Sequence, residues 1–201
     1  MSESKNTEET ILKSAQAVFV RKGMQGARMQ EIADEAGISK ALLHYYFRSK
    51  QKLFEAVFKR VLTGTFHKLN HIFTGELPVE EVIIHFTDEY IETLLKNPYI
   101  PEFIIHELNQ APELLQKQMT EILPDINPLL QRIEKEMQEG TIKKSDPKQV
   151  IMNTISLCIF PFVGRAIFTQ VLYEGNQEQF YQTMTERKKS VSDFILNALK
   201  P

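Results

Sequence analysis

The chain has 201 residues, 42% of them hydrophobic, so a sizeable core can form without structural metals, and its only cysteine, Cys158, excludes an intrachain disulfide. The net charge of −2 divides into +4 for residues 1–60, which hold eleven Lys/Arg and seven Asp/Glu, and −6 for residues 61–201. A basic head on an acidic body indicates that only the head contacts phosphate, although +4 over sixty residues is also compatible with an ordinary protein surface.

Neither the polar N-terminus nor the most apolar stretch of the chain indicates a targeting or membrane segment. Residues 1–10 are polar and acidic and lack an apolar signal region. The most apolar stretch, 151–172, is interrupted by Pro161, Gly164 and Arg165, so we expect a buried helix there and not a membrane span. With its single cysteine, the chain fits the reducing cytoplasm.

Helical patterns run through the first half, without sustained period-two alternation or a hairpin turn signal. Asn6 can cap a first helix, which Gly23 ends. Gly37 breaks a second helix, and Ser39 and Ser49 can cap the next two. The expected helices cover residues 6–23, 29–36, 39–47 and 50–70.

Prolines mark helix starts in the second half, at Pro78, Pro101, Pro112 and Pro147. Asp146 before Pro147 is the clearest of these signals, and Gly140 is a good C-terminal stop. We expect two helices with a break over residues 112–139, and two long final helices over 147–172 and 177–199. The prediction is an all-α fold of nine or ten helices.

The most informative stretch is residues 29–54. Ala33 is small where two helices cross, Gly37 suits a chain reversal with positive φ, and Leu43 packs the second helix onto the first. The second helix then exposes Lys40, Ala41, His44 and Tyr45, a surface that suits the major groove of DNA. A plain helical hairpin inside a bundle is the competing interpretation.

This stretch resembles the TetR family of one-component transcriptional regulators. The matching residues are Gly23, Ile32-Ala33, Ala36-Gly37-Ile38-Ser39, Leu43, Tyr46-Phe47, Ser49-Lys50 and Leu53. The resemblance is specific over residues 8–58, and the passage from Gly140 to Pro147 is similar to the family's entry to helix 8. It implies a three-helix helix-turn-helix domain over residues 1–48, and a helical ligand-binding and dimerisation domain over 49–201 that begins with helix 4.

The resemblance also implies roles for the DNA-binding residues. It assigns base-edge contacts to Lys40, Ala41, Leu42 and Tyr45. It assigns phosphate contacts to Ser39, His44, Tyr46 and Lys50, the last at the start of helix 4.

Three positions depart from the family pattern. Arg28 stands where Thr or Ser is usual, which loses a capping hydroxyl and substitutes a candidate phosphate contact. His44 replaces Tyr, and Leu42 replaces Thr, which exchanges a hydrogen bond for contact with a thymine methyl group. These departures leave the operator sequence open.

Residues 71–201 carry no catalytic signature, so we expect neither an enzyme nor a bound cofactor. His67 and His71 share a helix-face spacing, as do Glu102 and His106, but no further ligand stands at helical spacing nearby. We therefore expect no metal site.

The body is rich in aromatic and soft apolar residues, most of which are expected to be ordinary core. The resemblance implies that part of this core is a pocket for an apolar effector. The candidate lining residues are Phe86, Tyr90, Phe103, His106, Met119 and Phe160.

Apolar stripes on the last two helices suggest a homodimer interface, because a single short recognition helix makes too few base contacts for useful specificity. The stripes comprise Ile151, Ile155, Cys158, Ile159 and Phe162 on one helix and Met184, Val191, Phe194 and Ile195 on the other. Packing within one subunit is the competing account.

The sequence and the resemblance together predict a repressor of double-stranded operator DNA. Recognition helices about 34–36 Å apart enter successive major grooves, and an effector that shifts the helix at 50–70 changes that spacing. Two alternatives stay open. One is a DNA-binding adaptor whose body binds a protein, and the other is a ligand carrier with a vestigial head.

Overall fold

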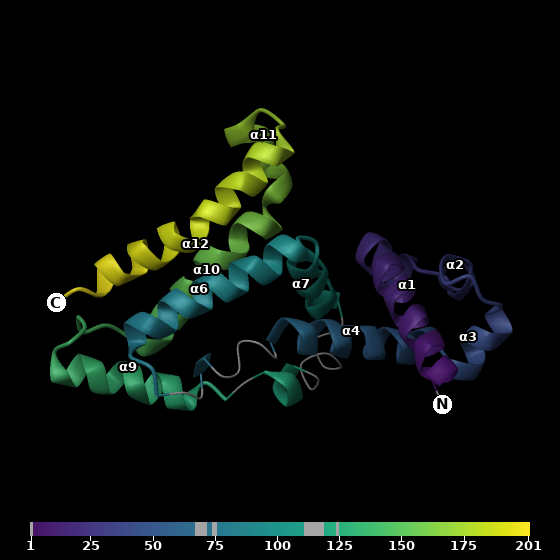
Figure 1. The fold of residues 1–201 in the computed structure, drawn as a ribbon, viewed down its shortest axis with the longest axis horizontal. Coiled ribbons are helices and arrows are strands. Elements are labelled where there is room, and N and C mark those ends of the chain that lie inside the picture. Colours follow the sequence, from purple (N-terminus) through teal and green to yellow (C-terminus); the bar gives the residue numbers. More distant parts are fainter. Residues whose placement is uncertain (1, 67–71, 74–75, 111–118, 124) are drawn as a thin grey trace. The chain divides into compact units, whose positions relative to one another are not determined.

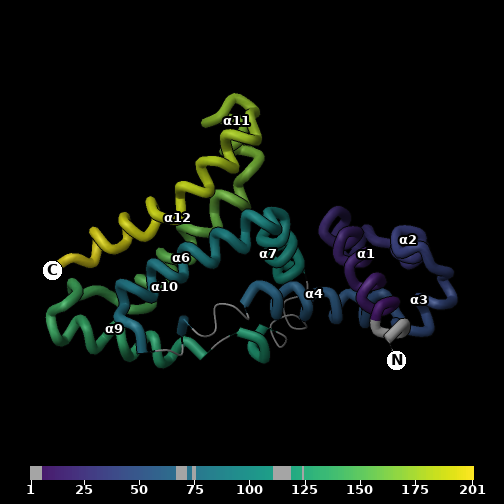
Figure 2. The backbone as a smooth tube through the Cα atoms, viewed as in Figure 1, coloured from purple at the N-terminus to yellow at the C-terminus, as the bar shows by residue number. Residues whose placement is uncertain are grey.

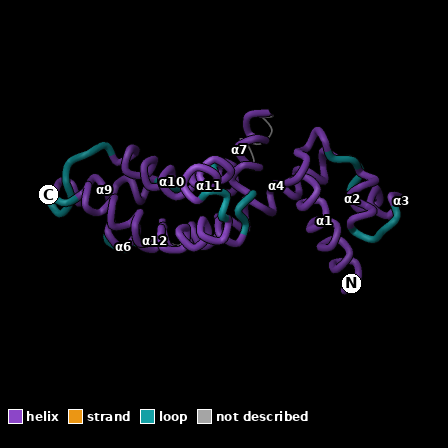
Figure 3. Tube along the Cα trace, turned by 90° about the horizontal axis from the view of Figure 1, so that it is seen from above, coloured by secondary structure: helices purple, strands orange, loops and turns teal. Residues whose placement is uncertain are grey.

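The computed structural model describes residues 2–66, 72–73, 76–110, 119–123 and 125–201, and no strand occurs among them (Figures 1 and 3). The helices with defined bounds are α1 (Ser2–Gly26), α2 (Met29–Glu35), α3 (Lys40–Tyr46), α4 (Lys50–Phe66), α6 (Val79–Lys96), α7 (Ile100–Gln110), α9 (Asn127–Glu139), α10 (Pro147–Val163), α11 (Arg165–Tyr173) and α12 (Gln177–Leu199). The predicted all-α fold is confirmed.

The chain forms two compact units. The N-terminal unit comprises Met1–Gly64 and Glu102–Ile122, and the C-terminal unit comprises Thr65–Pro101 and Leu123–Pro201. The first segment of the N-terminal unit thus extends beyond the predicted domain boundary at residue 48 and includes most of α4. The reason is that α4 packs against α1, where the rings of Phe19 and Phe54 meet edge to face with centroids 5.1 Å apart.

Aromatic packing builds the core of the N-terminal unit. Phe54 and Phe58 of α4 lie 6.0 and 6.1 Å from the ring of Phe103 on α7. Phe19, Phe54 and Phe58 are fully buried. This brings α7 from Glu102 onward into the N-terminal unit, which no local sequence signal predicts.

The first helix differs from the prediction at its start. It begins at Ser2, so Asn6 lies inside it, and the Asn6 carbonyl accepts a hydrogen bond from the Thr10 hydroxyl at 2.9 Å. At Gly23 the backbone leaves helical geometry, with φ of 65° and ψ of 174°, before one further turn to Gly26. Gly23 therefore bends the helix where the prediction ended it.

The C-terminal unit is organised around α6, which α12 and α10 accompany (Figures 1 and 2). The Asp146 carboxylate accepts from the Lys148 backbone N–H at 2.9 Å, and Gly140 ends α9 at φ of 75°, so both predicted caps are confirmed. The predicted helix 147–172 is instead two helices, α10 and α11, bent by 75° at Gly164.

No single described helix has both the length and the apolar composition needed to cross a membrane. Only the bent pair of α10 and α11, taken together, has them.

Candidate nucleic-acid interface

Helices α2 and α3 form a tight helix-turn-helix. Ala33 and Leu43 are fully buried where the two helices cross. Gly37 adopts φ of 67°, which favours glycine, and the Ile38 backbone N–H donates to the Ala33 carbonyl at 3.0 Å to close the turn. The small residue, turn glycine and aliphatic plug therefore have the roles predicted from their spacing.

One side of α3 faces outward. Tyr45 is 81% exposed, and Lys40, Ala41, Leu42 and His44 are also exposed. This side offers a cation, an imidazole, a phenol and short apolar groups within one seven-residue helix. These are the side-chain types that contact base edges in a major groove.

The flanking residues are held by local contacts. The Ser39 hydroxyl accepts from the Leu42 backbone N–H at 3.1 Å and so caps α3. The half-buried Tyr46 packs edge to face against Tyr45 at 5.5 Å. Arg28 is exposed at the start of α2 and makes no side-chain capping bond, as its substitution for a hydroxyl residue predicts.

Lys50 has a structural role that sequence reasoning missed. Its ammonium donates to the carbonyls of Gln25 at 3.3 Å and Ala27 at 3.1 Å, so it holds the end of α1 against the start of α4. These bonds engage two of its three donors. Its phosphate contact stays a prediction that depends on the remaining donor.

Several cationic side chains of residues 1–60 form ion pairs within the N-terminal unit. Lys22 pairs with Glu31 at 2.7 Å, and Arg21 with Glu35 at 3.1 Å, which ties α1 to α2. Arg60 binds the Glu9 carboxylate, and its hydrogen bonds lower the pKa of Glu9. Neither Arg28 nor Lys40 has an ion pair among the described residues, so these two cations are free for phosphate.

The helices α1 to α4 coincide with a known sequence pattern. Residues 11–57 match the family model described as "Bacterial regulatory proteins, tetR family". The transcriptional regulator SrpR of Pseudomonas putida is 24% identical over 178 residues, which are 87% of this chain and 77% of SrpR. The matched segment, residues 11–57, is a TetR-family DNA-binding region. The chain is a DNA-binding transcriptional regulator, and the relatives that it matches are transcriptional regulators.

Solved structures have the same fold as this chain along most of its length. The regulator FadR of Bacillus subtilis, in complex with stearoyl-CoA, has a TM-score of 0.66 at 16% identity, covering 94% of this chain and 98% of FadR. The fatty acid degradation regulator FadR of Bacillus halodurans has a TM-score of 0.66 at 15% identity, covering 94% of each chain.

The residues predicted to line an effector pocket are only partly brought together. Phe86 and Tyr90 are buried on α6 with ring centroids 5.1 Å apart, and Phe73 packs on Phe86 at 5.6 Å. Burial raises the pKa of the Tyr90 phenol well above its ordinary range. The free volume beside Phe86 is only about 30 Å³, room for about one water molecule.

The other pocket candidates lie elsewhere. Phe103 packs in the aromatic core of the N-terminal unit, to which Met119 also belongs, half-buried. His106 is exposed beside Gly23. Phe160 is 60% exposed on α10 and packs edge to face on Phe168 at 5.8 Å. Aromatic composition alone does not distinguish these environments. The prediction therefore assigned to one pocket several residues that lie in separate parts of the structure.

Most of the predicted dimer residues are core residues of this subunit. Cys158 and Phe162 on α10 and Met184, Val191 and Ile195 on α12 are buried within the subunit. For these five the burial favours packing within one subunit, because α12 packs lengthwise on α6 and α10 and this packing accounts for their apolar stripe. A dimer interface through these helices stays a prediction. Ile151 and Ile159 are half-buried, and Ile155 and Phe194 are exposed.

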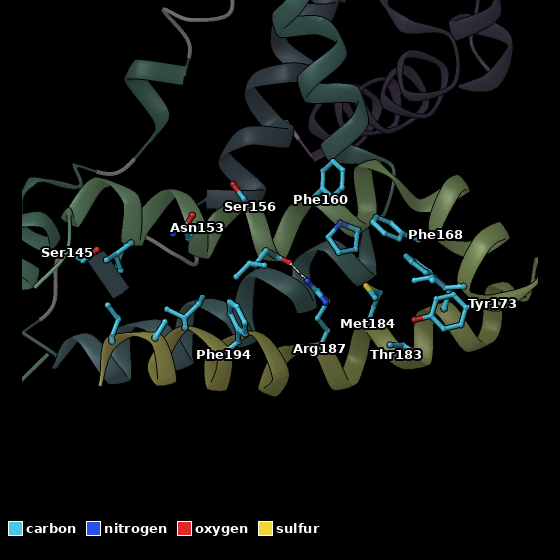
Figure 4. Close-up of a pocket in the computed structure, with 18 residues that line it drawn as sticks. Ser145, Asn153, Ser156, Phe160, Phe168, Tyr173, Thr183, Met184, Arg187 and Phe194 are labelled. Atoms are coloured by element: carbon cyan, nitrogen blue, oxygen red, sulfur yellow. Dashed lines mark hydrogen bonds between the residues drawn. The ribbon is translucent and has the colours of Figure 1, made fainter. Parts of the chain in front are cut away.

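An open groove of about 610 Å³ between α10, α11 and α12 was not predicted from the sequence (Figure 4). Phe160, Phe168 and Phe194 line it, and Arg187 crosses it to donate two hydrogen bonds to the Leu157 carbonyl at 3.0 and 3.1 Å. Seven large apolar side chains are exposed on these three helices, and three of them, Phe160, Leu172 and Phe194, line the groove: Met152, Ile155, Phe160, Ile167, Val171, Leu172 and Phe194. We call these seven residues the C-terminal apolar face.

Metal ligands are not grouped in the described part of the chain, where no three His, Cys, Asp or Glu side chains are close enough to hold an ion. His67 and His71 lie outside the described residues.

Proposed function

We propose that the protein is a homodimeric cytoplasmic repressor that binds operator DNA through α3 and leaves it when a small, largely apolar effector binds the C-terminal unit. The observation that carries the proposal is the outward side of α3, with Tyr45 81% exposed beside exposed Lys40 and His44. Two such helices, one turn of DNA apart, read two half-sites.

Within this proposal, the exposed side of α3 reads bases and its surroundings position the backbone. Lys40, Ala41, Leu42 and Tyr45 contact base edges, where Lys40 suits guanine and Leu42 suits a thymine methyl group. Phosphates are bound by Arg28, Ser39, His44, Tyr46 and the remaining donor of Lys50.

The C-terminal apolar face supports dimerisation. It holds seven of the fourteen large hydrophobic side chains that are exposed among the described residues. Large exposed apolar surfaces often mark protein–protein contacts, and a second copy of the chain would cover the apolar side chains around the groove beside Phe160 and Phe194.

An apolar effector is supported by a protein of the same fold, since FadR of Bacillus subtilis binds stearoyl-CoA. In this chain the best-supported contacts are Phe86 and Tyr90, which already pack together. Because only about 30 Å³ is free there, an effector must displace side chains of the core, and this repacking would be the conformational signal.

The experiment is in vitro transcription from a promoter carrying an operator selected from random DNA. Wild-type protein should repress, and stearoyl-CoA or a free fatty acid should restore transcription. The substitution Phe194→Glu should yield monomers in analytical ultracentrifugation and weaken operator binding. Ile84→Glu, which adds the same charge at an exposed position of α6, is the control and should do neither. Activation of the promoter, or a wild-type monomer that represses fully, would contradict the proposal.

A second candidate function is a DNA-binding adaptor whose body binds a protein. The close packing around Phe86 favours it, because the described residues leave only about 30 Å³ free there, too little for a small molecule. Under this alternative neither apolar probe releases the operator at saturating concentration, whereas the DNA-binding results stay the same.

A further inference from the structure

The C-terminal unit contains a second cavity, of about 290 Å³, at the turn between α11 and α12. Its lining combines a cation, amides, a hydroxyl and two phenols, which come from Tyr99, Arg165, Thr169, Gln170, Gln177 and Tyr181. None of these residues lines the groove beside Phe160 or the void beside Phe86. We call it the Arg165 cavity.

Arg165 supplies a cation without a carboxylate partner. Its guanidinium lies over the ring of Tyr99, 3.9 Å from the centroid, and its Nη1 donates to the Pro98 carbonyl at 3.2 Å. None of the ion pairs among the described residues includes Arg165, although the side chain is half-buried. A partly desolvated guanidinium held in place in this way presents its other N–H groups to an anion at little ordering cost.

Thr169 contributes a buried hydroxyl without a partner. The residue is 8% exposed, and its Oγ1 has no hydrogen bond among the described residues. Thr154 is the contrast within the same unit, because its hydroxyl donates to the Val150 carbonyl at 2.7 Å in the usual helical way. A buried hydroxyl left unsatisfied costs stability, so a partner that arrives with a ligand would remove the cost.

The two groups converge because of the helix repeat. Thr169 follows Arg165 by four residues on α11, so both lie on one face of the helix and line the same cavity. Gln170 and Gln177 add amide donors and acceptors at the edge, and Tyr181 adds an aromatic surface.

We propose that the Arg165 cavity binds a small organic carboxylate. The Arg165 fork holds the carboxylate, the Thr169 hydroxyl donates to one of its oxygens, and the organic part lies beside Tyr181. A single cation neutralises a monoanion, whereas a phosphate dianion would leave charge unpaired. The volume is at the small end of ligand pockets, which limits the ligand to a few rings or carbons. The site goes beyond the proposed function, because it shares no residue with the apolar effector contacts.

The test uses full-length protein and 4-fluorobenzoate, followed by ¹⁹F NMR titration and calorimetry. We expect saturable binding with Kd in the millimolar range or tighter, and binding of neutral 4-fluorobenzyl alcohol and of inorganic phosphate at least about tenfold weaker. Arg165→Gln should weaken benzoate binding about tenfold or more, and Arg165→Lys, which keeps the charge without the fork, by less. Lys144→Gln removes an exposed cation outside the cavity and should change nothing.

Thr169→Val gives a signature that loss of folding cannot imitate. It replaces the unpartnered hydroxyl by a methyl group of the same shape, so the melting temperature without ligand should rise by about 2–4 °C. Benzoate binding should weaken about threefold to tenfold in the same variant. Equal binding of acid and alcohol, tighter binding of phosphate, an unaffected Arg165→Gln, or a Thr169→Val that melts no higher would each overturn the proposal.

Discussion

The buried carboxylate of Glu107 on α7 accepts a hydrogen bond from the backbone N–H of Met24 in α1, at 2.9 Å. Gly23, the residue before Met24, has left helical geometry, so the Met24 N–H follows a break in the helix ladder. Glu107 is 3% exposed, so its side chain depends on protein groups such as the Met24 N–H for hydrogen bonds. The side chain thus fastens α7 to the bend of α1 inside the N-terminal unit.

Glu107→Ala should lower the free energy of unfolding by about 1–3 kcal/mol, because it leaves the Met24 N–H without its acceptor. Glu107→Gln keeps an acceptor oxygen and should lose less. Urea denaturation measures both. Glu102→Ala, which removes an exposed carboxylate from the same helix, is the control. Equal stability of Glu107→Ala and wild type would show that the bond is not a structural link.

Lys50→Ala should have two effects at once. It removes the donor to the Gln25 and Ala27 carbonyls, so unfolding should become easier by about 1 kcal/mol. It should also weaken binding to operator and random DNA alike and reduce the salt dependence of binding. Lys52→Ala removes an exposed lysine of the same helix and should leave stability unchanged. Loss of stability without any change in the salt slope would leave Lys50 a structural residue only.

Glu92 should make the stability of the C-terminal unit sensitive to acid. Hydrogen bonds from Lys188, at 2.8 Å, and from Lys96 lower its pKa from 4.5 to about 2. A carboxyl whose pKa is lowered by folding stabilises the native state above the unfolded pKa, and the contribution is lost as pH falls through the folded pKa.

The melting temperature of wild type should therefore exceed that of Glu92→Gln above pH 4.5, and the difference should shrink as pH falls toward about 2. Because Glu92 is near the surface, added salt should also reduce it. A difference that stays constant across this pH range would rule out the pairing as its cause.

Cys158 should be unreactive in the folded protein. It is fully buried on α10, and burial raises the pKa of its thiol to about 12. The thiolate, which is the reactive form, is therefore scarce at pH 8. Dithionitrobenzoate should label Cys158 only in denaturant, whatever the protein concentration. Rapid labelling of folded protein on dilution would instead restore Cys158 to a subunit interface.

The helix-turn-helix of α2 and α3 could be predicted from the sequence because the residues that determine it are close together in the chain. Ala33, Gly37 and Leu43 lie within eleven residues, and each acts through its size or its backbone freedom. The same holds for Asp146 and Gly140, whose capping roles depend on neighbours a few residues away.

The inward and outward faces of α10 and α12 could not be predicted. Cys158 and Phe162 are buried, whereas Phe160 between them in the sequence is exposed, and all three are apolar. A hydrophobic stripe has the same period whether it meets another helix of the subunit or of a partner. Phe103 shows the same limit, because only long-range packing assigns it to the N-terminal unit.

The most direct test of the central claim compares Tyr45→Ala with wild type on operator and on random DNA over a range of salt concentrations. The account predicts a loss of about 1–3 kcal/mol on operator, little change on random DNA and an unchanged salt slope, because Tyr45 contacts bases. Tyr99→Ala removes an exposed tyrosine of the C-terminal unit and should change neither affinity. Equal losses on both DNAs, or a wild-type protein that ignores duplex DNA at low salt, would contradict it.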